Sequence, residues 1–86
     1  MTASPLQVLI VEDSEKGALL TIQELKRSGF QPVCERVQTR EGMIAALPRK
    51  PWDIVIADYS MPHFSGLAAI ELIRSIGVDL PVIVVS

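Results

Sequence analysis

Apolar and polar positions succeed one another along this chain in a regular order of short and long segments. Three compact apolar runs and one alternating segment predict β-strands. The stretches between them carry apolar residues at every third or fourth position, which predicts amphipathic helices. The strands are expected at 6–11, 31–37, 54–57 and 82–85, and the helices at 14–28, 39–48 and 66–76. This alternation predicts an α/β domain with a parallel sheet and right-handed crossovers, in which the mixed pattern of 31–37 is typical of an edge strand.

Residues at the ends of the predicted helices support these boundaries. Ser14 and Thr39 are side chains that cap helix starts. Gly29 and Gly77 stand where a left-handed stop is expected, and Pro48 ends the second helix. The side chains predicted to face the sheet are Leu19, Ile22 and Leu25, with Ala18 beside them, in the first helix, and Leu67, Ile70 and Ile73 in the third.

Length and composition narrow the class of protein. The chain has 86 residues, enough for one domain, and a formal net charge of −2 without a basic stripe, which argues against direct nucleic-acid binding. Its single cysteine, Cys34, excludes an internal disulfide and suits a reducing cytoplasm. The first seven residues lack the features of a signal peptide, and no apolar run is long enough to cross a membrane.

The last predicted strand, residues 82–85, is continuously apolar, as in a strand covered on both faces. No further helix or strand follows it, so residues 1–86 are expected to be the N-terminal portion of a longer domain. An uncovered apolar edge strand favours pairing with a second chain. The sequence therefore predicts a homo-oligomer formed through this strand.

Acidic residues follow two of the predicted strands. Glu12 and Asp13 come after the first strand, and Asp58 comes after the third. Ligands of parallel α/β sheets bind outside the carboxyl ends of the strands, so the three carboxylates are expected to converge there. Carboxylates so placed repel one another unless a cation neutralises them, and hard oxygen ligands suit Mg²⁺. A magnesium site is therefore predicted at this edge.

These motifs together resemble the receiver domain of bacterial two-component response regulators. The resemblance covers essentially the whole chain and implies a flavodoxin-like, three-layer α/β fold of strand order 2-1-3-4, without the fifth strand and the last two helices. The segments that carry it are Val8-Leu9-Ile10-Val11-Glu12-Asp13, Ile54-Val55-Ile56-Ala57-Asp58, Met61-Pro62 followed by Gly66, and Pro81-Val82-Ile83-Val84-Val85-Ser86.

The resemblance implies a role for each matching residue. Asp58 matches the phosphoacceptor, which takes a phosphoryl group from a histidine kinase, a phosphotransfer protein or a small phosphodonor. Glu12 and Asp13 match the acidic pair that holds Mg²⁺ together with Asp58, and the backbone carbonyl of Ser60 matches a further ligand. Ser86 matches the hydroxyl that bonds the phosphoryl oxygen. The implied function is a signalling phosphoacceptor and not a turnover enzyme.

The chain also departs from the family's pattern. The family carries a lysine after the fifth strand and an aromatic residue on that strand, and neither segment is present. The first acidic position is Glu12 where aspartate is commoner, and His63-Phe64-Ser65 precedes Gly66. Mg²⁺ binding is expected to be retained and phosphorylation to be impaired.

Three other classes of function remain as alternatives. An aspartate-nucleophile phosphatase would need a second aspartate two residues after the first, where this chain has Asp13-Ser14-Glu15. A nucleotide- or flavin-binding domain would need glycines in the first strand–helix turn, which is acidic here. A self-associating fragment without signalling is the third. His63 and Cys34 are interpreted as a solvated loop residue and a packed strand residue.

Overall fold

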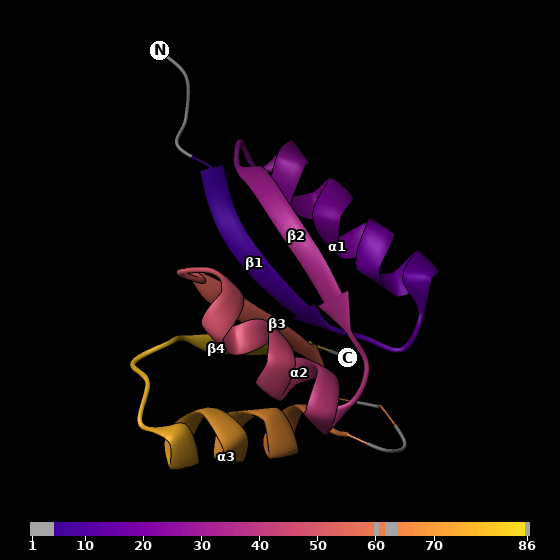
Figure 1. The fold of residues 1–86 in the computed structure, drawn as a ribbon. Coiled ribbons are helices and arrows are strands. Elements are labelled where there is room, and N and C mark those ends of the chain that lie inside the picture. The colour runs from indigo at the N-terminus through magenta and orange to yellow at the C-terminus, as the bar shows by residue number, and fades with distance from the viewer. Residues whose placement is uncertain (1–4, 60, 62–63, 86) are drawn as a thin grey trace.

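A parallel sheet forms the centre of the computed structural model, which describes residues 5–59, 61 and 64–85. Its strands are β1 (Pro5–Val11), β2 (Gln31–Val37), β3 (Ile54–Asp58) and β4 (Val82–Val85). They lie in the order β2-β1-β3-β4, with every neighbouring pair parallel. The predicted fold class, strand order and edge position of β2 are confirmed (Figure 1).

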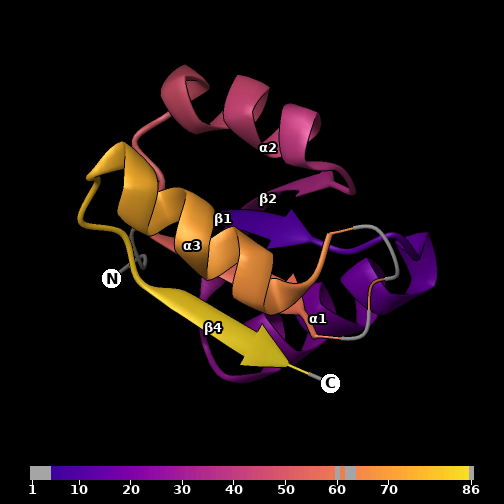
Figure 2. The same ribbon diagram turned by 90° about the horizontal axis from the view of Figure 1, so that it is seen from below.

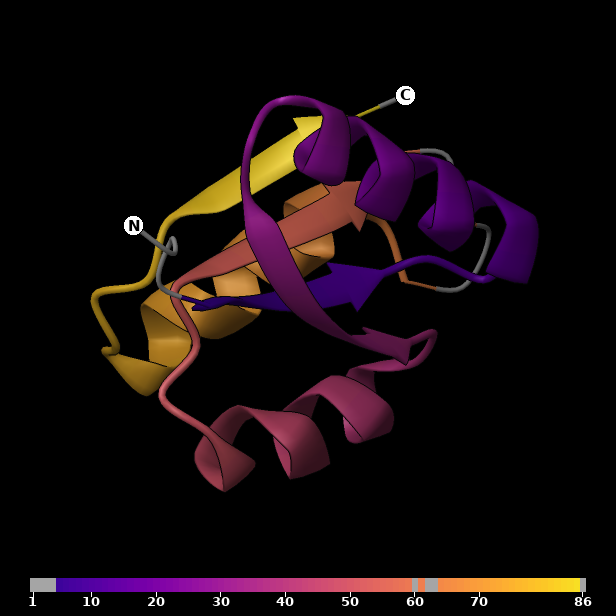
Figure 3. The same cartoon turned by 90° about the horizontal axis from the view of Figure 1, so that it is seen from above.

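Helices cover both faces of this sheet, which gives three layers. They are α1 (Glu15–Arg27), α2 (Arg40–Ala46), continued by the short 3-10 helix η1 (Leu47–Arg49), and α3 (Gly66–Ile76). The ribbon seen from below shows α3 and α2 over one face, with α1 on the other (Figure 2). The view from above shows α1 alone on its face (Figure 3). None of the helices described is long and apolar enough to cross a membrane.

The helix ends follow the predicted capping residues. The hydroxyl groups of Ser14 and Thr39 accept from the backbone N–H groups of Gly17 and Gly42, three residues further on. Gly77 caps α3 at φ +84°, and Gly29 also adopts a positive φ, of +95°. Only glycine takes this left-handed conformation without cost, so both glycines end their helices as predicted.

Side chains of the strands alternate between two separate cores. Leu9 and Val55 belong to the core beneath α2 and α3, whereas Ile10 and Ile56 belong to the core beneath α1. Trp52, just before β3, is buried in the first core, where its indole Nε1–H donates to the backbone oxygen of Ala46 at 3.0 Å. This contact ties the end of α2 to the start of β3.

Two of the side chains predicted to face the sheet do not do so. Leu19 is 52% exposed, and Leu67 is 55% exposed. In α1 the covered stripe starts from the buried Ala18, and in α3 it consists of Ala69, Leu72 and Ile73. The predicted stripes were wrong at these positions because small alanines, which let a helix approach the sheet closely, face the strands in their place.

Gly66, the first residue of α3, permits the close approach of this helix to β4. A Cβ atom at this position would lie 2.7 Å from Cγ1 and 3.2 Å from Cγ2 of Val84. Because the β-branched Val84 side chain is stiff, Gly66→Ala is expected to push α3 away from the strand and to cost about 1–3 kcal/mol of unfolding free energy. Urea unfolding followed by Trp52 fluorescence measures this loss, and an unchanged midpoint would contradict it.

Candidate metal and phosphoacceptor site

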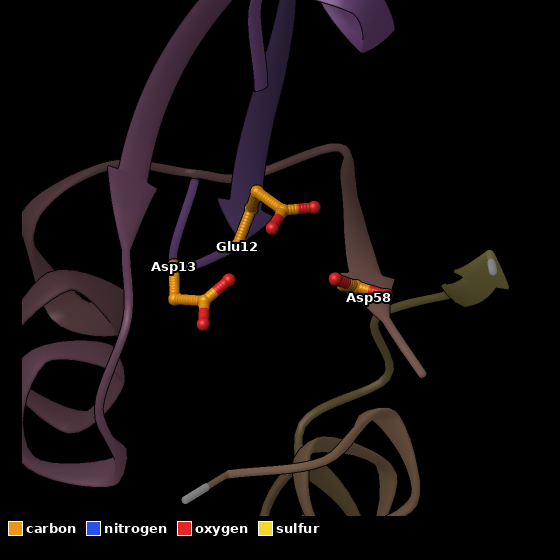
Figure 4. Close-up of side chains that lie close together, drawn as sticks. All are labelled: Glu12, Asp13 and Asp58. Atoms are coloured by element: carbon orange, nitrogen blue, oxygen red, sulfur yellow. The ribbon is translucent and has the colours of Figure 1, made fainter. Parts of the chain in front are cut away.

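The three predicted carboxylates meet at the carboxyl edge of the sheet. Asp58 is the last residue of β3, and Glu12 and Asp13 directly follow β1. These two strands are neighbours in which Val11 is paired with Ala57, so the residues after them lie side by side. Figure 4 shows the three side chains around one space. One carboxylate oxygen from each lies within 4.8 Å of the others.

Backbone hydrogen bonds fix Glu12 at this edge. Its N–H donates to the backbone oxygen of Val37 at 2.9 Å, which extends the pairing of β1 with β2 beyond the strands themselves. Its carboxylate Oε1 accepts from the backbone N–H of Ser14 at 3.1 Å. Since Ser14 caps α1, the Glu12 carboxylate lies at the start of this helix, where the helix dipole favours negative charge.

The sequence interpretation missed Arg36 as a contributor to the site. Its guanidinium Nη1–H donates to the backbone carbonyl oxygen of Glu12 at 3.2 Å. A side chain of β2 thus contacts the residue that follows β1. The position was visible in the sequence only as a charged residue of an alternating edge strand. Its contact with Glu12 depends on the parallel register that pairs Ile10 with Arg36.

The crowding of carboxylates changes the acidity of Glu12. Burial raises the pKa of this carboxyl above its ordinary value of 4.5, and the neighbouring Asp13 and Asp58 raise it further, while the hydrogen bond from Ser14 acts in the opposite direction. Both desolvation and like charges disfavour the ionised form. A cation bound among the three groups would remove this penalty.

This raised pKa predicts how stability depends on pH without metal. In the window above pH 4.5, up to the pKa of folded Glu12, the folded chain binds more protons at this group than the unfolded chain. The contribution of Glu12 to the unfolding free energy therefore falls as the pH rises through this window. The unfolding free energy of Glu12→Gln, relative to that of the unchanged chain, is therefore expected to rise with pH across this window without metal, as measured by urea unfolding at successive pH values. Parallel profiles for the two chains would contradict the assignment.

The donor set fits Mg²⁺. All three groups offer hard oxygen ligands, and among the described residues the cluster includes no nitrogen or sulfur ligand. One oxygen of each carboxylate lies within 4.8 Å of the others, so the three groups could hold one small cation between them, directly or through water.

The site is accessible from solvent. Glu12 and Asp58 line an open groove of about 480 Å³, whose other walls include Leu20 of α1 and Ile83 of β4. Asp13 is exposed, while Glu12 and Asp58 are half-buried. Both Glu12 and Asp58 therefore border on space that solvent can enter.

Three of the residues considered from the sequence lie outside the described part of the chain. They are Ser60, Ser86 and His63, so the roles assigned to them stay predictions. Cys34 is half-buried in β2, and burial raises the pKa of its thiol. A thiol with a raised pKa is a poor nucleophile, in agreement with its interpretation as a packed residue.

Comparison with known proteins shows the family. The family model described as the response regulator receiver domain matches residues 8–86. The chain belongs to this family. Its receiver fold carries the acidic cluster Glu12, Asp13 and Asp58 in an arrangement compatible with a phosphorylation site and with Mg²⁺, which receiver domains generally bind.

Relatives with this receiver domain come from a fungus, a plant and a bacterium. "Two-component system protein A" of Emericella nidulans is 35% identical over 81 residues, covering 92% of this chain and 12% of the relative. "Two-component response regulator ORR41" of Oryza sativa subsp. japonica is 31% identical over 88 residues, covering 100% of this chain and 69% of the relative. "Sensor histidine kinase RcsC" of Salmonella typhimurium is 28% identical over 78 residues, covering 91% of this chain and 8% of the relative. The chain thus spans about two thirds of the Oryza sativa relative and only a small part of the other two.

Proposed function

We propose that this receiver domain accepts a phosphoryl group on Asp58 in a two-component phosphorelay. The observation that carries the proposal is the meeting of Glu12, Asp13 and Asp58, with oxygens within 4.8 Å of one another, at the carboxyl edge of β1 and β3. The match to the receiver family over residues 8–86 supports the same role.

The proposed reaction transfers a phosphoryl group from a donor to Asp58. A carboxylate oxygen of Asp58 attacks the phosphorus atom, the bond from phosphorus to the donor breaks, and a mixed carboxylic–phosphoric anhydride forms on Asp58. With phosphohistidine as donor, the bonding electrons stay on the imidazole nitrogen, which then takes up a proton. The half-buried position of Asp58 beside an open groove supports attack from the solvent side.

Glu12, Asp13, Asp58 and the backbone carbonyl of Ser60 would hold the Mg²⁺ ion, with Asp13 as the more direct ligand of the acidic pair. The bound ion supplies charge neutralisation between an anionic nucleophile and an anionic phosphoryl group. The hydroxyl of Ser86 would then bond a phosphoryl oxygen, since the product adds strong acceptor oxygens at the site.

The partners follow from this chemistry. A histidine kinase or a phosphotransfer protein would supply the phosphoryl group, as the sensor histidine kinase name of one relative supports. The domain would act as a signalling acceptor in the cytoplasm, with at most weak self-dephosphorylation and no turnover of a separate substrate. The net charge of −2 supports the absence of direct nucleic-acid binding.

An NMR titration with Mg²⁺ tests the proposed metal site. Amide signals of Glu12, Asp13 and Asp58 are expected to shift with saturation, and Asp13→Asn is expected to weaken the affinity at least about tenfold. Asp79→Asn is a matched control, because this exposed aspartate lies in the connection before β4, at the other end of the sheet. Affinities that were equal in both variants would contradict the assignment of Asp13.

Fluorescence of Trp52 is a poor reporter for this titration. Trp52 precedes β3 and Asp58 ends it, so about 20 Å of extended chain separates the two. Tyr59, which is exposed and adjacent to Asp58, lies closer to the expected ion.

We also propose that the chain self-associates through β4. Within the described residues this strand is paired only on its β3 side. The side chains of Ile83 and Val85 are 48% and 40% exposed, so apolar surface adjoins an unpaired row of backbone groups. Such edges favour pairing with another strand, here that of a second copy.

Sedimentation at high micromolar concentration tests this second proposal. The unchanged chain is expected to form a dimer or larger species, and Ile83→Lys is expected to shift it towards monomer because a charge on an edge strand opposes pairing. Ile76→Lys is a matched control, since Ile76 is equally exposed, at 47%, but ends α3. A monomeric unchanged chain would contradict the proposal.

A further inference from the structure

Glu12 lies against a residue without a side chain. A Cβ atom at Gly17 would be 2.9 Å from Oε2, 3.0 Å from Cδ and 3.4 Å from Cγ of Glu12, and no other residue contributes to these nearest contacts. Gly17 is the third residue of α1, so the first turn of this helix forms one wall of the space that the Glu12 carboxylate occupies. Any side chain at Gly17 would take up that space.

We infer that Gly17 is a positioning residue for the metal site, because its missing side chain lets a glutamate serve at position 12. The inference rests on the proposed Mg²⁺ binding. A glutamate carries one methylene more than an aspartate, and this extra length must fit between the end of β1 and the first turn of α1. With Gly17 in place, Oε1 of Glu12 reaches the Ser14 N–H at 3.1 Å while the carboxylate stays within 4.8 Å of those of Asp13 and Asp58.

A side chain at Gly17 is expected to affect Mg²⁺ affinity and the unfolding free energy differently. The atoms in the way belong to the end of a flexible side chain, so Glu12 can turn aside at small cost to the fold. Gly17 itself has no positive φ, and an alanine within a helix is favoured over glycine by up to about 1 kcal/mol. Gly17→Ala is therefore expected to leave the unfolding free energy equal or higher while it weakens Mg²⁺ binding. A purely structural role of Gly17 would not produce these opposite changes.

Gly42 provides a matched control. It is likewise the third residue of its helix, α2, and its N–H donates to the hydroxyl of the capping residue Thr39 at 2.9 Å, as the N–H of Gly17 donates to Ser14 at 3.2 Å. A Cβ atom at Gly42 would meet Thr39 and Val37, and no carboxylate. Gly42→Ala therefore introduces the same residue at the same helix position, away from the metal site.

Mg²⁺ affinity, measured by calorimetry and by NMR, is expected to fall about tenfold in Gly17→Ala and to stay unchanged in Gly42→Ala. The amide signal of Ser14 should also shift in Gly17→Ala without metal, because its bond to Glu12 is lost. Glu12→Asp shortens the side chain by one methylene and so withdraws its carboxylate from the space beside Gly17. Adding Gly17→Ala to Glu12→Asp should therefore cost little further affinity.

The double-mutant comparison decides the inference. Equal affinities of Gly17→Ala and the unchanged chain, or an equal loss from Gly17→Ala in the Glu12 and Glu12→Asp backgrounds, would overturn it while leaving the proposed function intact. No Mg²⁺ binding by the unchanged chain would overturn the proposed function itself, and the inference with it.

Discussion

Replacing Asp58 with asparagine is expected to reduce the phosphate incorporated from acetyl phosphate to background. The carboxamide keeps the shape of the side chain at the end of β3, but its oxygen is neither charged nor a competent nucleophile towards phosphorus. Incorporation is measured as a mass increase of one phosphoryl group in the presence of Mg²⁺. Since an acyl phosphate is cleaved by hydroxylamine, loss of the added mass on such treatment identifies the linkage.

The effect of Asp58→Asn must be separated from a general loss of structure. Asp79→Asn is expected to retain the labelling of the unchanged chain, and the unfolding midpoint of Asp58→Asn should not fall. Labelling that persisted in Asp58→Asn would show that another group accepts the phosphoryl group. That result would contradict the assignment of the phosphoacceptor.

The largest expected effect on stability comes from Leu9. This side chain is fully buried at the centre of β1, in the core beneath α2 and α3. Leu9→Ala removes buried apolar atoms and leaves a cavity, so it is expected to cost about 2–5 kcal/mol of unfolding free energy. Single domains are stable by only about 5–15 kcal/mol, so the loss would unfold a substantial fraction of the chain under mild denaturant.

Leu67→Ala is the matched control for this prediction. The same atoms are removed, but Leu67 is 55% exposed on α3, so the expected loss is below about 1 kcal/mol. Urea unfolding of both variants, followed by Trp52 fluorescence, compares the two sites directly. Similar losses at Leu9 and Leu67 would contradict the burial of Leu9 in the core and the exposure of Leu67 on α3.

The elements of this fold were predictable because several local signals agree. The capping residues Ser14 and Thr39, the glycine stop at Gly77 and the apolar run of β4 each mark a boundary that the structure shows. The covered faces of the helices were harder to predict. Both Leu19 and Leu67 fit an apolar helical stripe, but which side of such a stripe meets the sheet depends on the closeness of packing, which small residues decide.

The candidate site was predictable in its carboxylates and unpredictable in their surroundings. The positions of Glu12, Asp13 and Asp58 at strand ends suffice to predict that the three carboxylates meet, because parallel neighbouring strands bring their carboxyl ends together. The contacts of Arg36 and Gly17 with Glu12 depend on the register of β2 and on the approach of α1, and both follow from packing across the whole domain. No local spacing in the sequence indicates either one.

The central claim is that Glu12, Asp13 and Asp58 act together in binding Mg²⁺ and a phosphoryl group. An NMR titration with Mg²⁺, with and without beryllofluoride as a phosphoryl mimic, tests it most directly. The claim predicts amide shifts at these three residues that grow when the mimic is added with Mg²⁺ and that vanish in Asp58→Asn. A spectrum unchanged by either addition would contradict it.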